Sequence, residues 1–253
     1  MAATPAPPTP TLVGVGVGPG DPELITVKAV AVLQRADVIL VPATEASADA
    51  AGRAEQVVLA ACPEAEAKLR RIPFSMAQRR GVGRARTESW QASAQAAVAA
   101  FSTGATTVAF ATVGDPSVYS TFSYLAAHVQ AVMPGVDVSV VPGITAMQAL
   151  AAASRTPLVE GTESLTLVPA TAGLETVRDA LAHSDTVVAY KGGRQLADLR
   201  VLVAASGREA VLGVNLGRPD QTITPLAQVS DDTAPYFSTV QIVPARDGIG
   251  GRL

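Results

Sequence analysis

Two tight turns of similar composition, each following an apolar segment, place the strongest constraint on how this chain can fold. Residues 12–22 read LVGVGVGPGDP, and residues 108–116 read VAFATVGDP. In each case a run typical of a buried strand ends at glycine and is followed by Asp-Pro. Asp is a favoured helix N-cap, and Pro suits the first helical position. Each turn is therefore expected to join a strand to a helix, as in an α/β fold.

The second turn is expected to start a helix at Asp115 that runs to about Val132 and carries Tyr119, Phe122, Tyr124 and Leu125. The first is expected to lead into a helix from Glu23 to Arg35. Its apolar face would hold Leu24, Val27, Val30, Ala31 and Leu33. Ligands of open α/β sheets bind beyond the carboxyl ends of the strands. Two such turns therefore favour one ligand site built from both, although either alone could be an ordinary capped connection.

The glycines of the first turn do not form a dinucleotide-binding fingerprint. Counted from Gly14, the third required glycine is replaced by Pro19; counted from Gly16, it is replaced by Asp21. Asp21 and Glu23 also place negative charge at a helix N-terminus, where they would repel a pyrophosphate. A ligand with hydroxyl groups, an amino group or a cationic centre fits this turn better.

Composition excludes several other classes of protein. The chain has 253 residues, 48% of them hydrophobic, and a formal net charge of -3, so a general nucleic-acid binder is not expected. Cys62 is the single cysteine, and His128 and His183 lie in no ligand-spaced motif, so neither a disulfide nor a metal site is expected. Residues 1–10 are expected to form a disordered tail without the features of a signal peptide. A soluble, cytoplasmic protein without a membrane span is expected.

The rest of the chain predicts two α/β domains, over residues 11–143 and 144–253. The first should contain a mostly parallel five-stranded sheet, with strands at 11–17, 36–42, 68–73, 108–113 and 136–141 and further helices at 43–61 and 87–101. In the second, a helix at 144–153 and helices at 174–183 and 194–206 accompany strands at 165–170, 186–190, 210–216, 222–229 and 237–243. The last two strands follow each other without a helix and are expected to pair antiparallel, which gives a mixed sheet.

A basic segment lies between the third strand and the following helix. Residues 68–86 contain Lys68 and six arginines, and no acidic residue occurs between Glu66 and Glu88. The segment could be a solvated surface. Alternatively, Arg79, Arg80 and Arg84 could grip a polyanionic small molecule, because guanidinium groups bind carboxylates in a bidentate manner.

The ordered motifs, taken together, resemble a known family. They are GVGPGDPELIT (16–26), ADVIL (36–40), GDPSVYSTFSYL (114–125), VPGITA (141–146), YKGGR (190–194), NLG (215–217) and PYFSTVQIV (235–243). This set resembles the tetrapyrrole (corrin/porphyrin) methyltransferase family over nearly the whole chain. Within that family, GDPSVYSTFSYL and PYFS are most similar to the members that methylate precorrin-2 at C20, giving precorrin-3A in cobalamin biosynthesis.

The resemblance implies S-adenosyl-L-methionine as cofactor, a cleft between the two domains that holds it, and a homodimer. Positions that match the family's cofactor contacts are Pro19, Val113, Gly114, Asp115, Val118, Thr145, Ala146, Tyr190, Lys191 and Gly217. Lys191 departs from the methionine often found at its position. Arg79, Arg80, Arg84 and Tyr119 are candidates for binding the tetrapyrrole. An electron-rich macrocycle needs no strong protein nucleophile, and no residue is assigned as a general base.

Several alternatives remain open at this point. The chain could act on cobalt-factor-II, methylate another position of the ring, or modify a protein or RNA. A nicotinamide oxidoreductase is disfavoured by the broken glycine pattern and the acidic helix starts. A ligand-binding module without activity would differ from an enzyme in transferring no labelled methyl group.

Overall fold

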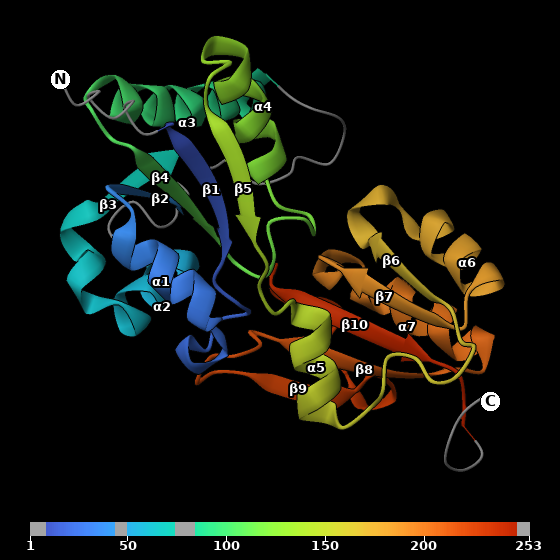
Figure 1. Ribbon diagram of the computed structural model, residues 1–253. Coiled ribbons are helices and arrows are strands. Elements are labelled where there is room, and N and C mark those ends of the chain that lie inside the picture. The colour runs from blue at the N-terminus through green and yellow to red at the C-terminus, as the bar shows by residue number, and fades with distance from the viewer. Residues whose placement is uncertain (1–8, 44–49, 74–83, 247–253) are drawn as a thin grey trace, which may run out of the picture. The chain divides into compact units, whose positions relative to one another are not determined.

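The computed structural model describes residues 9–43, 50–73 and 84–246 (Figure 1). Contacts within the chain divide it into two compact units, Met1–Thr145 and Ala146–Leu253. Each unit contains one five-stranded sheet with its own helices. The expected pair of α/β domains, one with a parallel and one with a mixed sheet, is confirmed. The tail expected at residues 1–10 lies mostly outside the described residues.

The first unit is built on a parallel sheet with strand order β3-β2-β4-β1-β5. Its strands are β1 (Thr11–Gly16), β2 (Val38–Ala43), β3 (Leu69–Pro73), β4 (Thr107–Thr112) and β5 (Asp137–Val141). Its helices are α1 (Val27–Arg35), α2 (Arg53–Ala61), α3 (Arg84–Ser102) and α4 (Phe122–Val132), with short 3-10 helices η1 (Pro22–Leu24) and η3 (Pro63–Lys68). The expected helix at 43–61 is shorter than predicted, since α2 begins at Arg53, and 44–49 lie outside the described residues.

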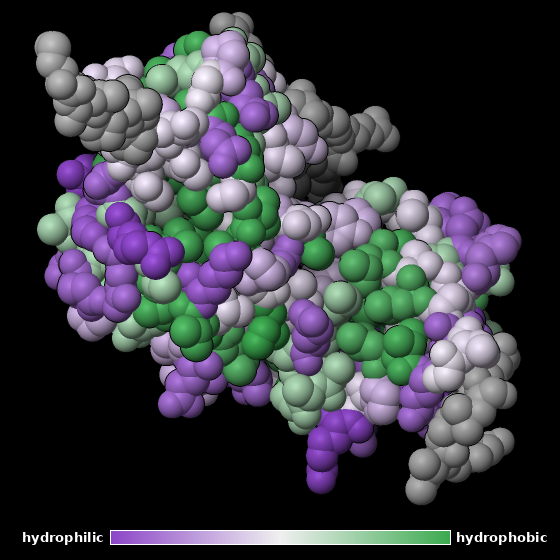
Figure 2. Space-filling model, viewed as in Figure 1, coloured by the Kyte–Doolittle hydropathy of each residue, from purple (hydrophilic) through white to green (hydrophobic). Residues whose placement is uncertain are grey.

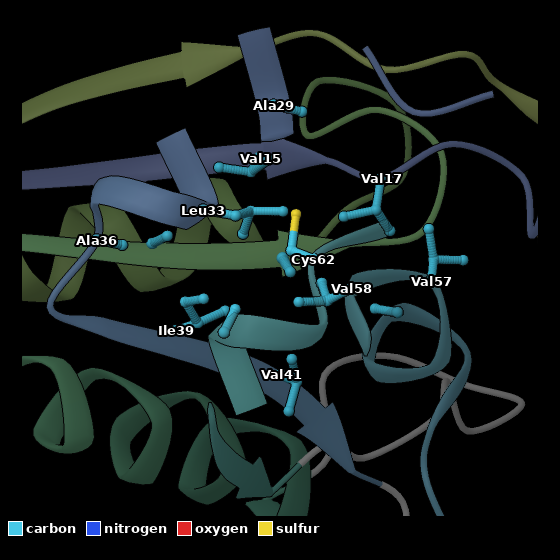
Figure 3. Packing of buried hydrophobic residues seen from close by; sticks show 14 of the residues in the cluster. Val15, Val17, Ala29, Leu33, Ala36, Ile39, Val41, Val57, Val58 and Cys62 are labelled. Carbon is cyan, nitrogen blue, oxygen red and sulfur yellow. The ribbon is translucent and has the colours of Figure 1, made fainter. Parts of the chain in front are cut away.

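Two apolar cores cover the two faces of this sheet. Alternate residues of β1, β2 and β4 pack against α1 and α2 on one face and against α3 and α4 on the other. Cys62 lies inside the first core with Val15, Leu33 and Val58 (Figure 3). Its burial raises the pKa of the thiol. The cysteine therefore serves as a small apolar residue.

The second unit is built on a mixed sheet with strand order β6-β7-β10-β8-β9 (Figure 1). Its strands are β6 (Leu165–Pro169), β7 (Thr186–Tyr190), β8 (Glu209–Val214), β9 (Thr222–Pro225) and β10 (Ser238–Val243). Its helices are α5 (Ala146–Ser154), α6 (Leu174–His183) and α7 (Leu196–Ser206), with short 3-10 helices η4 (Ala170–Ala172), η5 (Gly193–Gln195) and η6 (Leu226–Gln228). One face of the sheet packs against α6 and α7, and α5 contacts the strands β9 and β10.

The expected antiparallel pairing of the last two strands is wrong. β10 inserts between β7 and β8 and is antiparallel to both, while β9 pairs with the other edge of β8. The burial of β10 agrees with this placement, because all six of its residues are buried and an edge strand would leave one side open. β10 thus joins the parallel β6–β7 pair to the rest of the sheet.

Both Asp-Pro turns begin their long helices later than the sequence predicts. Asp21 caps only η1, and Thr26 caps α1, whose first residue Val27 is 87% exposed and not on the apolar face. The helix expected from Asp115 starts at Phe122. Tyr119 adopts a left-handed φ of 50°, which interrupts any helix between Asp115 and Phe122.

The surface carries hydrophobic and hydrophilic residues in mixture on the face shown in Figure 2. Large hydrophobic side chains that are exposed include Val27, Tyr119, Tyr124, Val132, Val140, Val159, Val201 and Phe237. Among the described residues, no helix is both long and apolar enough to span a membrane.

Candidate functional site

The turns that follow β1, β4 and β5 meet at the carboxyl edge of the first sheet, where these strands are neighbours. The amide of Gly114 donates to the carbonyl oxygen of Gly18 at 2.7 Å, and Gly18 donates back at 3.4 Å. A Cβ on Gly143 would lie 2.2 Å from the carbonyl oxygen of Gly114, and one on Gly16 would lie 2.6 Å from the nitrogen of Gly143. These contacts leave room only for glycine. We call Gly16, Gly18, Gly114 and Gly143 the glycine junction.

Asp115 holds this junction together and does not cap a long helix. Its Oδ1 accepts a hydrogen bond from the amide of Ser117 at 2.7 Å. Its Oδ2 accepts one from the amide of Gly143 at 2.9 Å, which links the turn after β4 to the turn after β5. The expected N-cap role for α4 is therefore wrong. The carboxylate satisfies two backbone donors in a part of the chain where no helix hydrogen bonds exist.

The other candidates of the first unit lie around the glycine junction. Pro19 is buried directly after Gly18, and the amide of Val118 donates to the carbonyl oxygen of Asp115 at 3.2 Å. Thr145 is 6% exposed, and its Cα is 3.9 Å from where a Cβ on Gly114 would lie. The half-buried Val113 precedes Gly114 in the same turn. The sequence-predicted residues of this unit are thus brought to one edge of the sheet.

The candidates of the second unit lie where β7 and β8 end. The hydroxyl oxygen of Tyr190, the last residue of β7, accepts a hydrogen bond from the amide of Met147 at 3.2 Å, next to Ala146 at the start of α5. Lys191 follows with a left-handed φ of 60°. Gly217, in the turn after β8, has a φ of 76°, and its amide donates to Gln221 Oε1 at 2.8 Å.

The start of β10 connects these two turns. The amide of Lys191 donates to the carbonyl oxygen of Ser238 at 3.2 Å, and the amide of Asn215 donates to that of Phe237 at 3.0 Å. Asp220 accepts hydrogen bonds from Arg218 and Asn215, and the pairing with Arg218 lowers the pKa of its carboxyl. The negative charge in the turn after β8 is therefore already compensated.

The candidates for substrate binding are only partly described. Arg79 and Arg80 lie outside the described residues. Arg84 is the first residue of α3. Tyr119 is 42% exposed and follows the Asp115 turn. The proposal that these residues bind an anion remains a prediction.

Sequence reasoning missed Gly143 as the partner of Asp115 and missed the role of residues 236–238 in joining two turns. A signal was present in each case, since Pro142-Gly143 ends one strand and PYFS precedes another. The partners could not be assigned because they depend on the order of strands in each sheet.

Each edge offers groups suited to a polar organic ligand. The first provides the buried Thr145 and the Asp115 carboxylate, and the second provides Tyr190, Lys191 and the Gly217 turn. An ionised carboxylate has about four acceptor positions, so Asp115 retains acceptor capacity beyond its two backbone bonds.

Comparison with known proteins agrees with this architecture. The family model of Tetrapyrrole (Corrin/Porphyrin) Methylases matches residues 11–230. The chain is 36% identical over 235 residues to a precorrin-2 C(20)-methyltransferase from Sinorhizobium sp, covering 90% of this chain and 93% of that protein. It is 30% identical over 228 residues to a cobalt-precorrin-2 C(20)-methyltransferase from Salmonella typhimurium, covering 88% of this chain and 92% of that protein.

A solved structure of similar fold is the uroporphyrin-III C-methyl transferase from Thermus thermophilus complexed with S-adenyl homocysteine. It has a TM-score of 0.62 and 20% identity, and the match covers 92% of this chain and 92% of that one. The likeness at this identity concerns the fold. Because the family model extends from β1 to beyond β9 and the sequence similarity spans both units, this chain is a methyltransferase that belongs to the tetrapyrrole (corrin/porphyrin) methylase family.

Proposed function

We propose that this methyltransferase transfers a methyl group from S-adenosyl-L-methionine to C20 of precorrin-2, giving precorrin-3A in cobalamin biosynthesis. The observation that carries the proposal is the 36% identity, over 90% of the chain, to a protein named for this reaction. The solved neighbour that contains S-adenyl homocysteine supports the cofactor. We also propose that the enzyme is cytoplasmic and acts as a homodimer.

The donors and acceptors at the two edges fit such a cofactor. S-adenosyl-L-methionine supplies an electrophilic methyl group on a sulfonium centre, so the protein has to bind and orient it. We propose that Pro19, Val113, Gly114, Asp115, Val118 and Thr145 of the first unit contribute to its binding. Ala146, Tyr190, Lys191 and Gly217 are proposed to contribute from the second. Asp115 would accept hydrogen bonds from ribose hydroxyls or the ammonium, and Gly114 would allow close backbone approach.

The proposed substrate contacts are Arg79, Arg80, Arg84 and Tyr119. Precorrin-2 carries many carboxylates, which guanidinium groups bind well. Replacing Arg79, Arg80 and Arg84 together by Ala should raise the KM for the tetrapyrrole and leave cofactor affinity nearly unchanged. Unchanged substrate kinetics at low salt would instead assign these residues to a solvated surface.

The decisive experiment identifies the product. Incubation with precorrin-2 and methyl-labelled S-adenosyl-L-methionine should add one labelled methyl group, and NMR should place it on C20. In calorimetry, S-adenosyl-L-methionine and its demethylated product should bind with micromolar-range affinity, whereas NAD should not bind. A product methylated at another carbon, or NAD binding without cofactor binding, would refute the proposal.

Cobalt-precorrin-2 is the second candidate substrate. It is supported by the 30% identity to the enzyme from Salmonella typhimurium. A direct comparison of kcat/KM for the metal-free and cobalt-containing substrates separates the two. We expect the metal-free substrate to be preferred, because the identity to the Sinorhizobium protein is higher.

A further inference from the structure

A lysine and two aromatic side chains gather where β7 ends and β10 begins. The Nζ atom of Lys191 lies 5.6 Å from the centroid of the Tyr236 ring. The rings of Tyr236 and Phe237 meet edge to face, with centroids 5.2 Å apart and an interplanar angle of 88°. Phe237 is 40% exposed. We call Lys191, Tyr236 and Phe237 the aromatic–lysine cluster.

The backbone fixes the position of this cluster within the second unit. The amide of Lys191 donates to Ser238, as described above, and the amide of Ala234 donates to the carbonyl oxygen of Gly193 at 2.8 Å. A Cβ on Gly193 would lie 2.1 Å from the carbonyl oxygen of Ala234. Residues 191–193 and 234–238 are therefore in close contact along their length. The aromatic residues cannot move away from Lys191 without breaking these contacts.

Lys191 occupies an unfavourable backbone conformation. Its φ of 60° lies in the left-handed region, which long L side chains rarely adopt. Gly192 and Gly193 follow directly. Glycine adopts a left-handed φ easily, yet the residue with this conformation is Lys191 and not one of the glycines. Strained positions of this kind persist where the surroundings fix them and often carry functional side chains. A role for the Lys191 side chain is consistent with that pattern.

The charge of Lys191 suits the substrate better than the cofactor. S-adenosyl-L-methionine carries a sulfonium, an ammonium and a single carboxylate, so its net charge is positive and a lysine ammonium gains little net attraction from it. A tetrapyrrole with carboxylate side chains offers the opposite charge, together with flat pyrrole rings that can pack on aromatic faces. Asp220, the acid in the turn after β8, is paired with Arg218 and does not oppose this attraction.

We infer that the aromatic–lysine cluster is a subsite for the tetrapyrrole substrate. The Lys191 ammonium binds a substrate carboxylate, and Tyr236 and Phe237 pack against the neighbouring pyrrole. Lys191 remains a cofactor contact only through its backbone. This inference rests on the proposed function and specifies its substrate contacts in the second unit.

Binding of uroporphyrin III, a fluorescent tetrapyrrole polycarboxylate, tests the inference without cofactor or turnover. Lys191→Met keeps most of the side-chain length and removes the charge, so it should weaken binding about two- to fivefold at low salt, the size expected for a partly exposed charged contact. The salt dependence of binding should become shallower. Lys191→Arg should bind nearly as wild type. Tyr236→Leu and Phe237→Leu should each weaken binding while retaining its salt dependence.

The matched control is Lys28→Met, which removes the same charge from an exposed position on α1. It should leave uroporphyrin binding unchanged. If Lys191→Met binds uroporphyrin as Lys28→Met does, or if it weakens S-adenosyl-L-methionine binding instead, the inference is wrong. The same holds if the wild-type protein binds no uroporphyrin. If Tyr236→Leu does not fold, the comparison of uroporphyrin binding by Lys191→Met and Lys191→Arg still tests the inference. Failure of the proposed function would show separately, as absence of C20 methylation by the wild-type enzyme.

Discussion

Asp115 connects two turns through one carboxylate, and this arrangement predicts the effect of small changes. An asparagine has one acceptor oxygen, so Asp115→Asn would turn its NH₂ group towards the amide of Ser117 or of Gly143. We expect the free energy of unfolding to fall by about 0.5–1.5 kcal/mol, the net contribution of one hydrogen bond, because Ser117 is exposed and Gly143 is only half-buried. Urea denaturation measures the change. Ser117→Ala is the control, because it retains the backbone amide and should unfold as wild type does. An Asp115→Asn protein of unchanged stability would contradict this role.

Gly143 predicts a larger effect, because any Cβ there would collide with the carbonyl oxygen of Gly114. Gly143→Ala should lower the free energy of unfolding by at least about 1–3 kcal/mol, as overpacking does. The control is Gly135→Ala, since a Cβ on Gly135 would meet no atom within 4 Å. Thermal melting of the two variants side by side checks the prediction, and equal melting temperatures would count against the junction.

The sequence predicts these residues better than it predicts their roles. Gly114 and Asp115 stand out because strand, glycine and Asp-Pro occur together. An aspartate before proline can cap a helix or bond to a distant amide, and local sequence does not distinguish the two. The choice here depends on β5 lying next to β1, which is a long-range property of the sheet.

Among whole elements, the segment after β10 is held to the segment before β6 by a buried ion pair. Nε and Nη2 of Arg246 bind the two carboxylate oxygens of Glu163 at 3.1 and 2.6 Å. The side chains are 13% and 3% exposed. The hydrogen bonds from Arg246 hold the pKa of the Glu163 carboxyl below its ordinary value, against the opposing effect of burial.

Arg246→Met should therefore be strongly destabilising. Removing one partner of a buried pair typically costs about 3–5 kcal/mol, because the other charge stays buried. Glu163 keeps one hydrogen bond, which its Oε2 accepts from the amide of Glu160 at 2.9 Å, so we expect a loss near the lower end of this range. The contribution of a carboxyl with a lowered pKa is present above its unfolded pKa of about 4.3 and is lost as pH falls through the folded pKa. The difference between variant and wild type should accordingly shrink in acid.

The exposed Glu175–Arg178 pair of α6 supplies the control for this prediction. Arg178→Met should change the free energy of unfolding by less than about 1 kcal/mol. Denaturant titrations of both variants across the acid range provide the measurement. A pH-independent deficit for Arg246→Met would mean that lost packing, not charge, is responsible.

Elements with strong local patterns were predictable, and those set by distant partners were not. The helix over 174–183 is confirmed with the same bounds, because its apolar period is regular. The pairing of β9 with β10 was mispredicted because neighbours in sequence need not be neighbours in a sheet. The late start of α4 follows from the left-handed Tyr119, which no propensity indicates.

At the scale of the whole molecule, each unit buries its own apolar core. The core between α6, α7 and the mixed sheet uses residues of the second unit alone. We expect residues 146–253 expressed alone to fold, with a cooperative thermal transition in circular dichroism. The matched fragment 165–253 lacks α5 and its contacts with Leu216, and should not fold cooperatively. Equal behaviour of the two fragments would show that α5 is dispensable.

Composition and motif order together predicted two α/β domains and the family. These predictions succeeded because each depends on many residues and not on any single one. The positions that join separate turns required coordinates. Gly143, Ser238 and Phe237 act through backbone atoms, whose partners are fixed only once the strands are ordered.

The glycine junction also limits how this enzyme can be altered by evolution or by engineering. Three connections meet there through backbone contacts, so none can gain or lose residues without displacing the others. The opposite edge of the same sheet has open turns at Gly104 and Gly135, where added atoms meet nothing nearby. Epitope tags and inserted domains belong at those turns. New substrate preferences in this scaffold would have to arise by exchanging side chains, since the lengths of the connections at the junction are fixed.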